Sequence, residues 1–175
     1  TATELKFIVE NTVMDALVTF DMILANVRPV VKETGLKRVI VTKITDYING
    51  LGVSTAKSLE LEEGWLHFSE LIENCKDTRP PRVILMPADP AMIQFTGGTT
   101  GFPKGALLTH GNLVAATFQC GMWASPGAYS PIAMPQTERS ALCVLPYFHV
   151  YGNIAAMNWA FFGCAKQIIV PRFEI

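Results

Sequence analysis

The sequence is poor in charge and in cysteine, and each shortage excludes a class of protein. Only 17% of its 175 residues are charged and the net charge is −1, with no basic stretch. Since nucleic-acid-binding proteins carry basic patches, we expect no nucleic-acid partner. The four cysteines form no Cys-x-x-Cys pair, which argues against a metal or redox motif. We expect reduced, mostly buried thiols in a cytoplasmic protein.

Signals for export or membrane insertion are also missing. The chain opens Thr-Ala-Thr-Glu-Leu-Lys, without the basic and then apolar start of a secretory signal. It also lacks an initiator Met, so we expect a piece of a longer protein. The most apolar stretch, 150–165, contains two asparagines and is shorter than the roughly 20 residues that a span needs. We predict a buried helix there and no transmembrane span; peripheral membrane association of the longer protein stays open.

Helical and strand patterns alternate along the chain. We predict helices at 2–10, 21–34, 66–76, 112–124 and 150–162, with Asp21 capping the second and Gly35 ending it. Strands are expected at 16–20, 38–42, 91–95, 106–109, 140–145 and 167–170. Residues 44–63, 78–90 and 125–136 are predicted to be loops. This order predicts an α/β fold with a mostly parallel sheet and helices on both faces, in a single domain over 1–175.

The most informative stretch runs from Gln94 to Gly105 and combines four glycines, three threonines and one lysine between two predicted strands. Glycine lets the backbone approach an anion closely, and successive N–H groups in such a loop form an anion-binding concavity. The threonines add hydroxyl donors, and Lys104 adds a mobile positive charge. The loop at 95–106 is therefore predicted to bind phosphate.

Two common glycine-rich motifs and a simple hairpin turn fit residues 94–105 less well than an anion-binding loop does. Lys104 follows Pro103 and precedes Gly105, so the Walker pattern Gly-x-x-x-x-Gly-Lys-Ser/Thr fails. The dinucleotide fingerprint requires Gly-x-Gly-x-x-Gly opening a helix, whereas a strand is expected to follow here. A hairpin turn is usually two to five residues long and needs fewer threonines.

The run Thr-Gly-Gly-Thr-Thr-Gly-Phe-Pro-Lys-Gly at 96–105 resembles the nucleotide-binding signature of the AMP-forming adenylating enzymes. That superfamily contains acyl-CoA synthetases, luciferases and peptide-synthetase adenylation domains. Gly98 stands where many members have Ser, and the continuation Ala-Leu-Leu-Thr-His-Gly-Asn-Leu at 106–113 is also similar. The sequence as a whole is most similar to fatty-acyl-CoA synthetases of long- or medium-chain type, and it would form part of their large N-terminal domain.

A second motif, Leu-Pro-Tyr-Phe-His-Val-Tyr-Gly at 145–152, lies where a strand is expected to meet a helix. From its residues alone, His149 fits a substrate pocket or a packed core position equally well. The segment resembles the Pro-Leu-Phe-His-x-x-Gly motif of acyl-CoA synthetases, with Tyr147 in place of the usual Leu. By this resemblance His149, Tyr151 and Gly152 would border the acyl substrate.

The resemblance implies an enzyme that forms acyl-adenylate and pyrophosphate from a fatty acid and ATP with Mg²⁺, and then transfers the acyl group to coenzyme A. The residues implied to hold the ATP phosphates are Thr96, Gly97, Gly98, Thr99, Thr100, Gly101 and Lys104. Lys104 and Thr100 would assist phosphate positioning. The chain contains no residue set that completes a catalytic centre and no predicted metal ligand.

Later signatures of the superfamily are missing from this sequence: a Tyr-Gly-x-Thr-Glu run, a ribose-binding Asp, and the lysine of a C-terminal domain. We therefore expect the 175 residues alone to bind phosphates weakly and not to turn over. Two alternatives stay open: a sibling enzyme that adenylates aryl or amino acids or resembles luciferase, and a non-catalytic nucleotide-binding module. His110 is expected to have a local capping or packing role, and His67 to be solvated.

Overall fold

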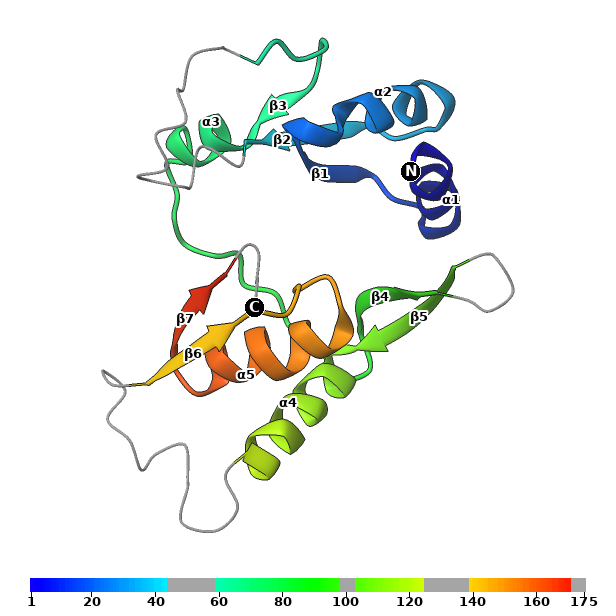
Figure 1. Ribbon diagram of the computed structural model, residues 1–175. Helices are drawn as coiled ribbons and strands as arrows, with labels where there is room; N and C mark the ends of the chain where they lie inside the picture. Colours follow the sequence, from blue (N-terminus) through cyan, green and yellow to red (C-terminus); the bar gives the residue numbers. More distant parts are fainter. Residues whose placement is uncertain (44–58, 98–102, 125–138, 171–175) are drawn as a thin grey trace. The chain divides into compact units, whose positions relative to one another are not determined.

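The computed structural model describes residues 1–43, 59–97, 103–124 and 139–170. The chain forms two compact units, Thr1–Pro81 and Arg82–Ile175, each with its own strands and helices (Figure 1). The predicted loop at 125–136 and most of the one at 44–63 lie outside the described residues.

The first unit is built on a parallel sheet in the order β1-β2-β3. Its elements in chain order are α1 (Ala2–Thr12), β1 (Ala16–Phe20), the 3₁₀-helix η1 (Asp21–Ile23), α2 (Leu24–Glu33), β2 (Arg38–Thr42), β3 (Leu66–His67) and α3 (Phe68–Glu73). β1 pairs with β2 along its whole length, from Ala16 opposite Arg38 to Phe20 opposite Thr42. The predicted strands 16–20 and 38–42 are confirmed.

The core of this unit consists of aliphatic side chains from α1, α2 and the strands. Val27 of α2 and Val39 and Val41 of β2 are almost completely buried. β-Branched residues suit a strand, and alternate ones point to the same face, so Val39 and Val41 both face the helices. Burying each such side chain contributes about 1.5–3 kcal/mol.

The second unit contains β4 (Pro90–Thr96), β5 (Lys104–Thr109), α4 (His110–Ala124), β6 (Ser140–Cys143), the π-helix η4 (Gly152–Asn158), α5 (Trp159–Phe162) and β7 (Lys166–Ile169). β6 and β7 are parallel, with Ser140 opposite Lys166. β4 and β5 form an antiparallel hairpin, from which α4 starts directly (Figure 1). α4 packs against η4 and α5. The fold is α/β, with parallel pairing in the β1-β2-β3 and β6-β7 sheets and the antiparallel hairpin as the exception.

Several local predictions were wrong in detail. Asp21 does not cap α2: it starts η1, Ile23 holds the N-cap position without a side-chain bond, and one carboxylate oxygen of Asp21 is buried without a partner among the described residues. The helix predicted at 66–76 begins with the short strand β3, so His67 lies at its end and is half-buried rather than solvated. Cys75 and Cys164 are exposed and only Cys143 is buried, so the thiols are not mostly buried.

The predicted apolar helix at 150–162 is present, but its middle is π-helical. Val150 and Tyr151 are α-helical, η4 follows, and α5 completes the helix. The amide Nδ2 of Asn158 donates to Oδ1 of Asn153 at 3.1 Å, a pair five residues apart that suits the wider π-helical turn. Within the described ranges, no helix is long and apolar enough to cross a membrane.

Candidate functional site

The two ends of the glycine-rich loop are fixed by the hairpin that carries it. The last pair of the β4–β5 ladder is Thr96 opposite Lys104, and the hydroxyl of Thr96 donates to the carbonyl oxygen of Lys104 at 3.3 Å. Residues directly opposite each other in an antiparallel pair extend from the same face. The hydroxyl of Thr96 and the ammonium of Lys104 therefore start from the same side of the hairpin, at the mouth of the loop.

The pairing of the strands depends on Gly105. Phe95 lies directly opposite Gly105, and a Cβ on Gly105 would lie 2.8 Å from Cγ2 of Ile93 and 3.3 Å from the ring of Phe95. The aromatic ring thus covers the space that a glycine leaves in a strand. Gly105 therefore has a packing role, whatever the loop binds.

Lys104 is exposed, and within the part of the chain that the structure describes no hydrogen bond or ion pair involves its ammonium. Gly97 is exposed, and apart from its chain neighbours no atom of the described residues lies within 4 Å of a Cβ built on it. A free ammonium beside open backbone is suited to meeting an anion from solvent. The other predicted phosphate ligands, Gly98, Thr99, Thr100 and Gly101, lie outside the described residues.

The 145–152 segment makes a tight turn between β6 and the apolar helix. The backbone N–H of His149 donates to the carbonyl of Pro146 at 3.1 Å, and the N–H of Asn153 donates to the carbonyl of His149 at 2.8 Å. Gly152 is buried, and a Cβ built on it would lie 2.3 Å from the Pro146 carbonyl oxygen. The turn therefore requires glycine at position 152.

The two motifs are brought together by one side chain, that of Gln94. Its amide Nε2 donates to the backbone carbonyl of Phe148 at 3.0 Å, across 54 positions in the sequence. Gln94 is on the strand that leads into the glycine loop, and Phe148 directly precedes His149. The strand before the predicted phosphate loop and the predicted acyl segment thus meet in one unit.

Tyr147 connects the turn to β7. Its hydroxyl donates to Oε1 of Gln167 on β7 at 2.6 Å. Burial, together with the nearby thiol of Cys143, raises the pKa of Tyr147 to about 12. A leucine could not make the bond to Gln167, so the departure from the family motif at this position gives this chain an additional contact.

Tyr147 makes stability depend on pH in a predictable way. Its pKa is about 10 when unfolded and is raised on folding, so its contribution is complete below about pH 10 and is lost as pH rises through about 12. Because Tyr147 is half-buried, we expect a loss of the order of 1 kcal/mol. Urea unfolding between about pH 9 and about pH 12 should show a steeper decline for the wild type than for Tyr147→Phe. Equal slopes would contradict the assignment.

Two cavities adjoin Tyr151, which is exposed. One of about 720 Å³ is lined by residues of α4 and of the apolar helix, among them Cys120, Trp123 and Ile154. The second, of about 230 Å³, is lined by β6 and η4. The larger one has mainly apolar walls and is a groove open to solvent, in which Trp123 is 86% exposed and Tyr151 66% exposed. His149 is exposed, its ring 6.2 Å from that of Phe148.

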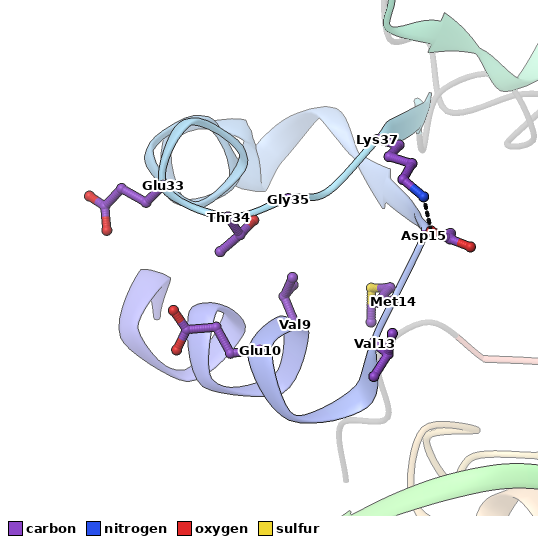
Figure 2. Close-up of a pocket in the computed structure, with 9 residues that line it drawn as sticks. All are labelled: Val9, Glu10, Val13, Met14, Asp15, Glu33, Thr34, Gly35 and Lys37. Carbon is purple, nitrogen blue, oxygen red and sulfur yellow. Dashed lines mark hydrogen bonds and ion pairs between the residues drawn. The ribbon is translucent and has the colours of Figure 1, made fainter.

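A further pocket of about 410 Å³ lies in the first unit (Figure 2). It is lined by the end of α1 and the end of α2, and none of its residues was a predicted site residue. Two of its carboxylates are already paired: Asp15 with Lys37 at 3.0 Å and Glu33 with Lys6 at 2.7 Å. These ion pairs lower the pKa of Asp15 and raise the pKa of Lys6, as expected for surface pairs.

A match to a sequence profile over the whole chain decides the family. The sequence profile described as AMP-binding enzyme matches residues 1–175. The chain belongs to the AMP-binding enzyme family. The resemblance identified in the 96–105 motif is thereby confirmed.

Curated relatives of this AMP-binding domain are CoA ligases by name. A long-chain-fatty-acid–CoA ligase of Bacillus subtilis (strain 168) is 26% identical over 181 residues, covering 98% of this chain and 31% of that protein. The 4-coumarate–CoA ligase 1 of Solanum tuberosum is 34% identical over 135 residues, covering 76% of this chain and 23% of that protein. The chain spans less than a third of the length of these relatives.

Solved structures show the same fold. ATP-bound MatB from Rhodopseudomonas palustris matches with a TM-score of 0.73 and 19% identity, covering 99% of this chain and 29% of that one. The anthranilate CoA ligase AuaEII, solved in complex with anthranoyl-AMP, matches with a TM-score of 0.72 and 15% identity, over 99% of this chain and 29% of that one. The expected α/β fold of an adenylating N-terminal domain is confirmed.

Sequence reasoning missed Gln94 as a contact between the motifs and Cys120, Trp123 and Ile154 as cavity residues. The spacing of residues 116, 119, 120 and 123 marks one face of α4 and signals a shared surface. His110 contributes through its backbone: its N–H donates to the Asp89 carbonyl at 3.0 Å, which satisfies the first turn of α4. Thr109 and Asn112 complete this cap through reciprocal bonds.

Proposed function

We propose that this chain is the phosphate-clamp portion of the N-terminal domain of an ATP-dependent acyl-CoA ligase, with a cytoplasmic location. The observation that carries the proposal is the Gln94–Phe148 hydrogen bond, which joins the strand before the glycine loop to the His149 turn. A ligase that adenylates an acid must hold ATP phosphates and a carboxylate next to each other. The two motifs that meet at this bond have the chemistry for each task.

In the proposed reaction an oxygen of the acid's carboxylate attacks the α-phosphorus of ATP, and the bond from that phosphorus to the bridging oxygen breaks. Pyrophosphate leaves with the bonding electrons, and acyl-adenylate remains. The thiol of coenzyme A then loses its proton and attacks the acyl carbon, and AMP leaves. Both steps require charge stabilisation and alignment, and neither requires a covalent bond to this chain.

The residues of this chain would act as donors to the departing phosphates. Thr96 and Lys104 flank the loop from one face, and the intervening glycines would supply backbone N–H groups. The proposed phosphate ligands are the seven residues Thr96, Gly97, Gly98, Thr99, Thr100, Gly101 and Lys104. The proposed neighbours of the acid are His149, Tyr151 and Gly152, with the 720 Å³ cavity beside Tyr151 receiving its apolar part.

The described part of this chain offers no cluster of side chains that would hold a magnesium ion without the nucleotide. Over those residues no group of three or more His, Cys, Asp or Glu could hold a metal ion. Magnesium at a nucleotide is held by one or two carboxylates together with phosphates and waters. The groups beside the loop, a hydroxyl and an ammonium, do not fit that pattern, so no step of the proposal passes through the metal.

The acid is a fatty acid or an aryl acid. One group of relatives supports the first by coverage, and another supports the second by sequence identity. A long-chain-fatty-acid–CoA ligase matches nearly the whole chain at 26% identity, and we favour a fatty acid. The 4-coumarate–CoA ligases reach 34% identity over a shorter stretch, which supports an aryl acid as the second candidate. Trp123 and Tyr151 in the cavity wall are compatible with both, because aromatic side chains pack against alkyl chains and rings alike.

An ATP–pyrophosphate exchange assay tests the proposal. The full-length enzyme, meaning this chain with the rest of its polypeptide, is incubated with ATP, labelled pyrophosphate and a panel of fatty and aryl acids. We expect exchange that depends on one class of acid, followed by acyl-CoA when coenzyme A is added. No exchange with any acid would overturn the proposal.

The same assay on residues 1–175 alone is its internal control. We expect no acyl-CoA, since the chain spans less than a third of its relatives and lacks the later signatures of the superfamily. Acyl-CoA production by this piece would show that the clamp and turn suffice for the chemistry.

A further inference from the structure

The orientation of the Gln94 amide is determined by its partners. Its Nε2 donates to the carbonyl of Phe148 at 3.0 Å and also lies 3.4 Å from the carbonyl of Phe95. Both partners are carbonyl oxygens, which only accept, so the NH₂ group rather than the amide oxygen must face them. The two hydrogens of one NH₂ group allow one bond to each carbonyl.

Each of these two carbonyls belongs to a residue that directly precedes a group of proposed ligands. Phe95 directly precedes Thr96, the first residue of the phosphate-loop motif, and Phe148 directly precedes His149. One planar amide therefore connects the backbone just before each group of proposed ligands. A displacement of the β4 end would be passed on to the His149 turn through this amide.

Gln94 also lies on the face of the hairpin from which the proposed phosphate ligands extend. Side chains alternate along a strand, so Gln94 and Thr96 share a face, and Lys104 lies opposite Thr96 on that face. The opposite face of the hairpin is used for its own packing. There, a Cβ on Gly105 would touch Ile93 and Phe95. Phosphates bound at the loop mouth would thus be on the same side as the link to the His149 turn.

Few hydrogen bonds join the hairpin to the turn in the described part of the unit, although α4, which leaves the hairpin, also packs against η4. The turn is otherwise held by its own Pro146–His149 backbone bond and by Tyr147 on β7, neither of which involves the hairpin. The hairpin is otherwise held by its own ladder and by the α4 cap. In the described part of the unit, Gln94 makes the hydrogen bond that joins hairpin and turn directly.

From this geometry we infer that Gln94 is a positioning residue that couples phosphate binding at the glycine loop to acid binding at the His149 turn. The inference rests on the proposed function and adds a role for Gln94, which opens the glycine-rich stretch but is not among the proposed ligands. Phosphate contacts at the β4 end act on the Phe148 carbonyl through the amide, and with it on the start of the helix that carries Tyr151. Binding of ATP then increases the affinity for the acid, and the acid increases the affinity for ATP by the same factor.

The test compares Gln94→Met and Gln94→Glu with the wild type in the full-length enzyme. Both variants keep the length of the side chain and remove the NH₂ donor. The KM for the acid is measured by pyrophosphate exchange at low and at saturating ATP. In the wild type we expect saturating ATP to lower this KM by about 10-fold, and in both variants we expect the ratio to fall to about one.

A purely structural role would give a different result. Partial unfolding reduces the amount of active enzyme, so it lowers kcat and leaves each KM and their ATP dependence unchanged. The matched control is Asn74→Leu, which removes an amide-to-carbonyl bond of the same kind, from Asn74 to Glu70 at 2.8 Å, in the first unit. We expect this control to keep the full ATP dependence of the acid KM.

Hydrogen exchange supplies a readout that does not depend on catalysis. The amide of His149 donates to Pro146 within the turn, and we expect it to exchange about 5-fold faster in Gln94→Met than in the wild type. If the wild type shows no acid-dependent exchange of pyrophosphate, the proposed ligase function fails. If the wild type is active and the variants retain both its KM ratio and the protection of His149, the coupling role of Gln94 fails.

Discussion

Replacing Lys104 by alanine in the full-length enzyme is expected to lower kcat/KM for ATP by about 100- to 1,000-fold, the usual effect of losing one preorganised donor to a developing negative charge. The ammonium of Lys104 is exposed at the mouth of the glycine loop and is not engaged in an ion pair within the described residues. Pyrophosphate exchange at varied ATP measures the effect.

Two further variants separate charge from geometry. Lys166→Ala removes another exposed lysine of the same unit, from β7, and should leave the exchange rate unchanged. Lys104→Arg keeps the charge but replaces a mobile point charge by a planar fork, so we expect an intermediate loss. Unchanged kinetics in Lys104→Ala would show that the phosphates are held without this side chain.

The strands predicted best from the sequence are those whose own residues favour strand structure. β1 and β2 lie at the predicted positions because Val18, Val39, Ile40 and Val41 are β-branched, and in β2 they alternate between buried and less buried positions. β3 was missed because Leu66 and His67 form a strand only by pairing with β2, a contact between distant residues. Local amphipathicity predicted a helix there, and the helix begins only at Phe68.

The candidate site was predictable as two motifs but not as one arrangement. The Thr and Gly residues of the loop and the residues of the His149 turn are visible in the sequence because their chemistry is local. The antiparallel pairing of β4 with β5 departs from the predicted mostly parallel sheet, and it follows from the short connection between Thr96 and Lys104, since parallel neighbours need a crossover of about a dozen residues or more. Gln94 opens the glycine-rich stretch, but nothing local indicates its partner, because Phe148 is 54 positions away. Such a contact follows only from the tertiary structure.

A glycine-to-alanine change at position 152 is expected to destabilise the second unit by about 2–3 kcal/mol, through overpacking against backbone. The new Cβ would lie 2.3 Å from the Pro146 carbonyl oxygen and 2.9 Å from its carbon. These are backbone atoms rather than the end of a flexible side chain, so the turn itself must open to admit a methyl group. Chemical unfolding measures the loss, and pyrophosphate exchange should show a raised KM for the acid.

Gly121→Ala is the matched control, because Gly121 is also helical, buried and in the second unit. Its nearest neighbour, the indole of Trp159, would lie 3.6 Å from the added Cβ, an ordinary van der Waals distance. Alanine in a helix is more favourable than glycine by roughly 0.5–1 kcal/mol, so this variant should be at least as stable as the wild type. The two substitutions add the same methyl group, and only the contact with Pro146 distinguishes them. Equal stabilities would therefore mean that the turn can relax around position 152 and that close backbone packing is not what requires glycine there.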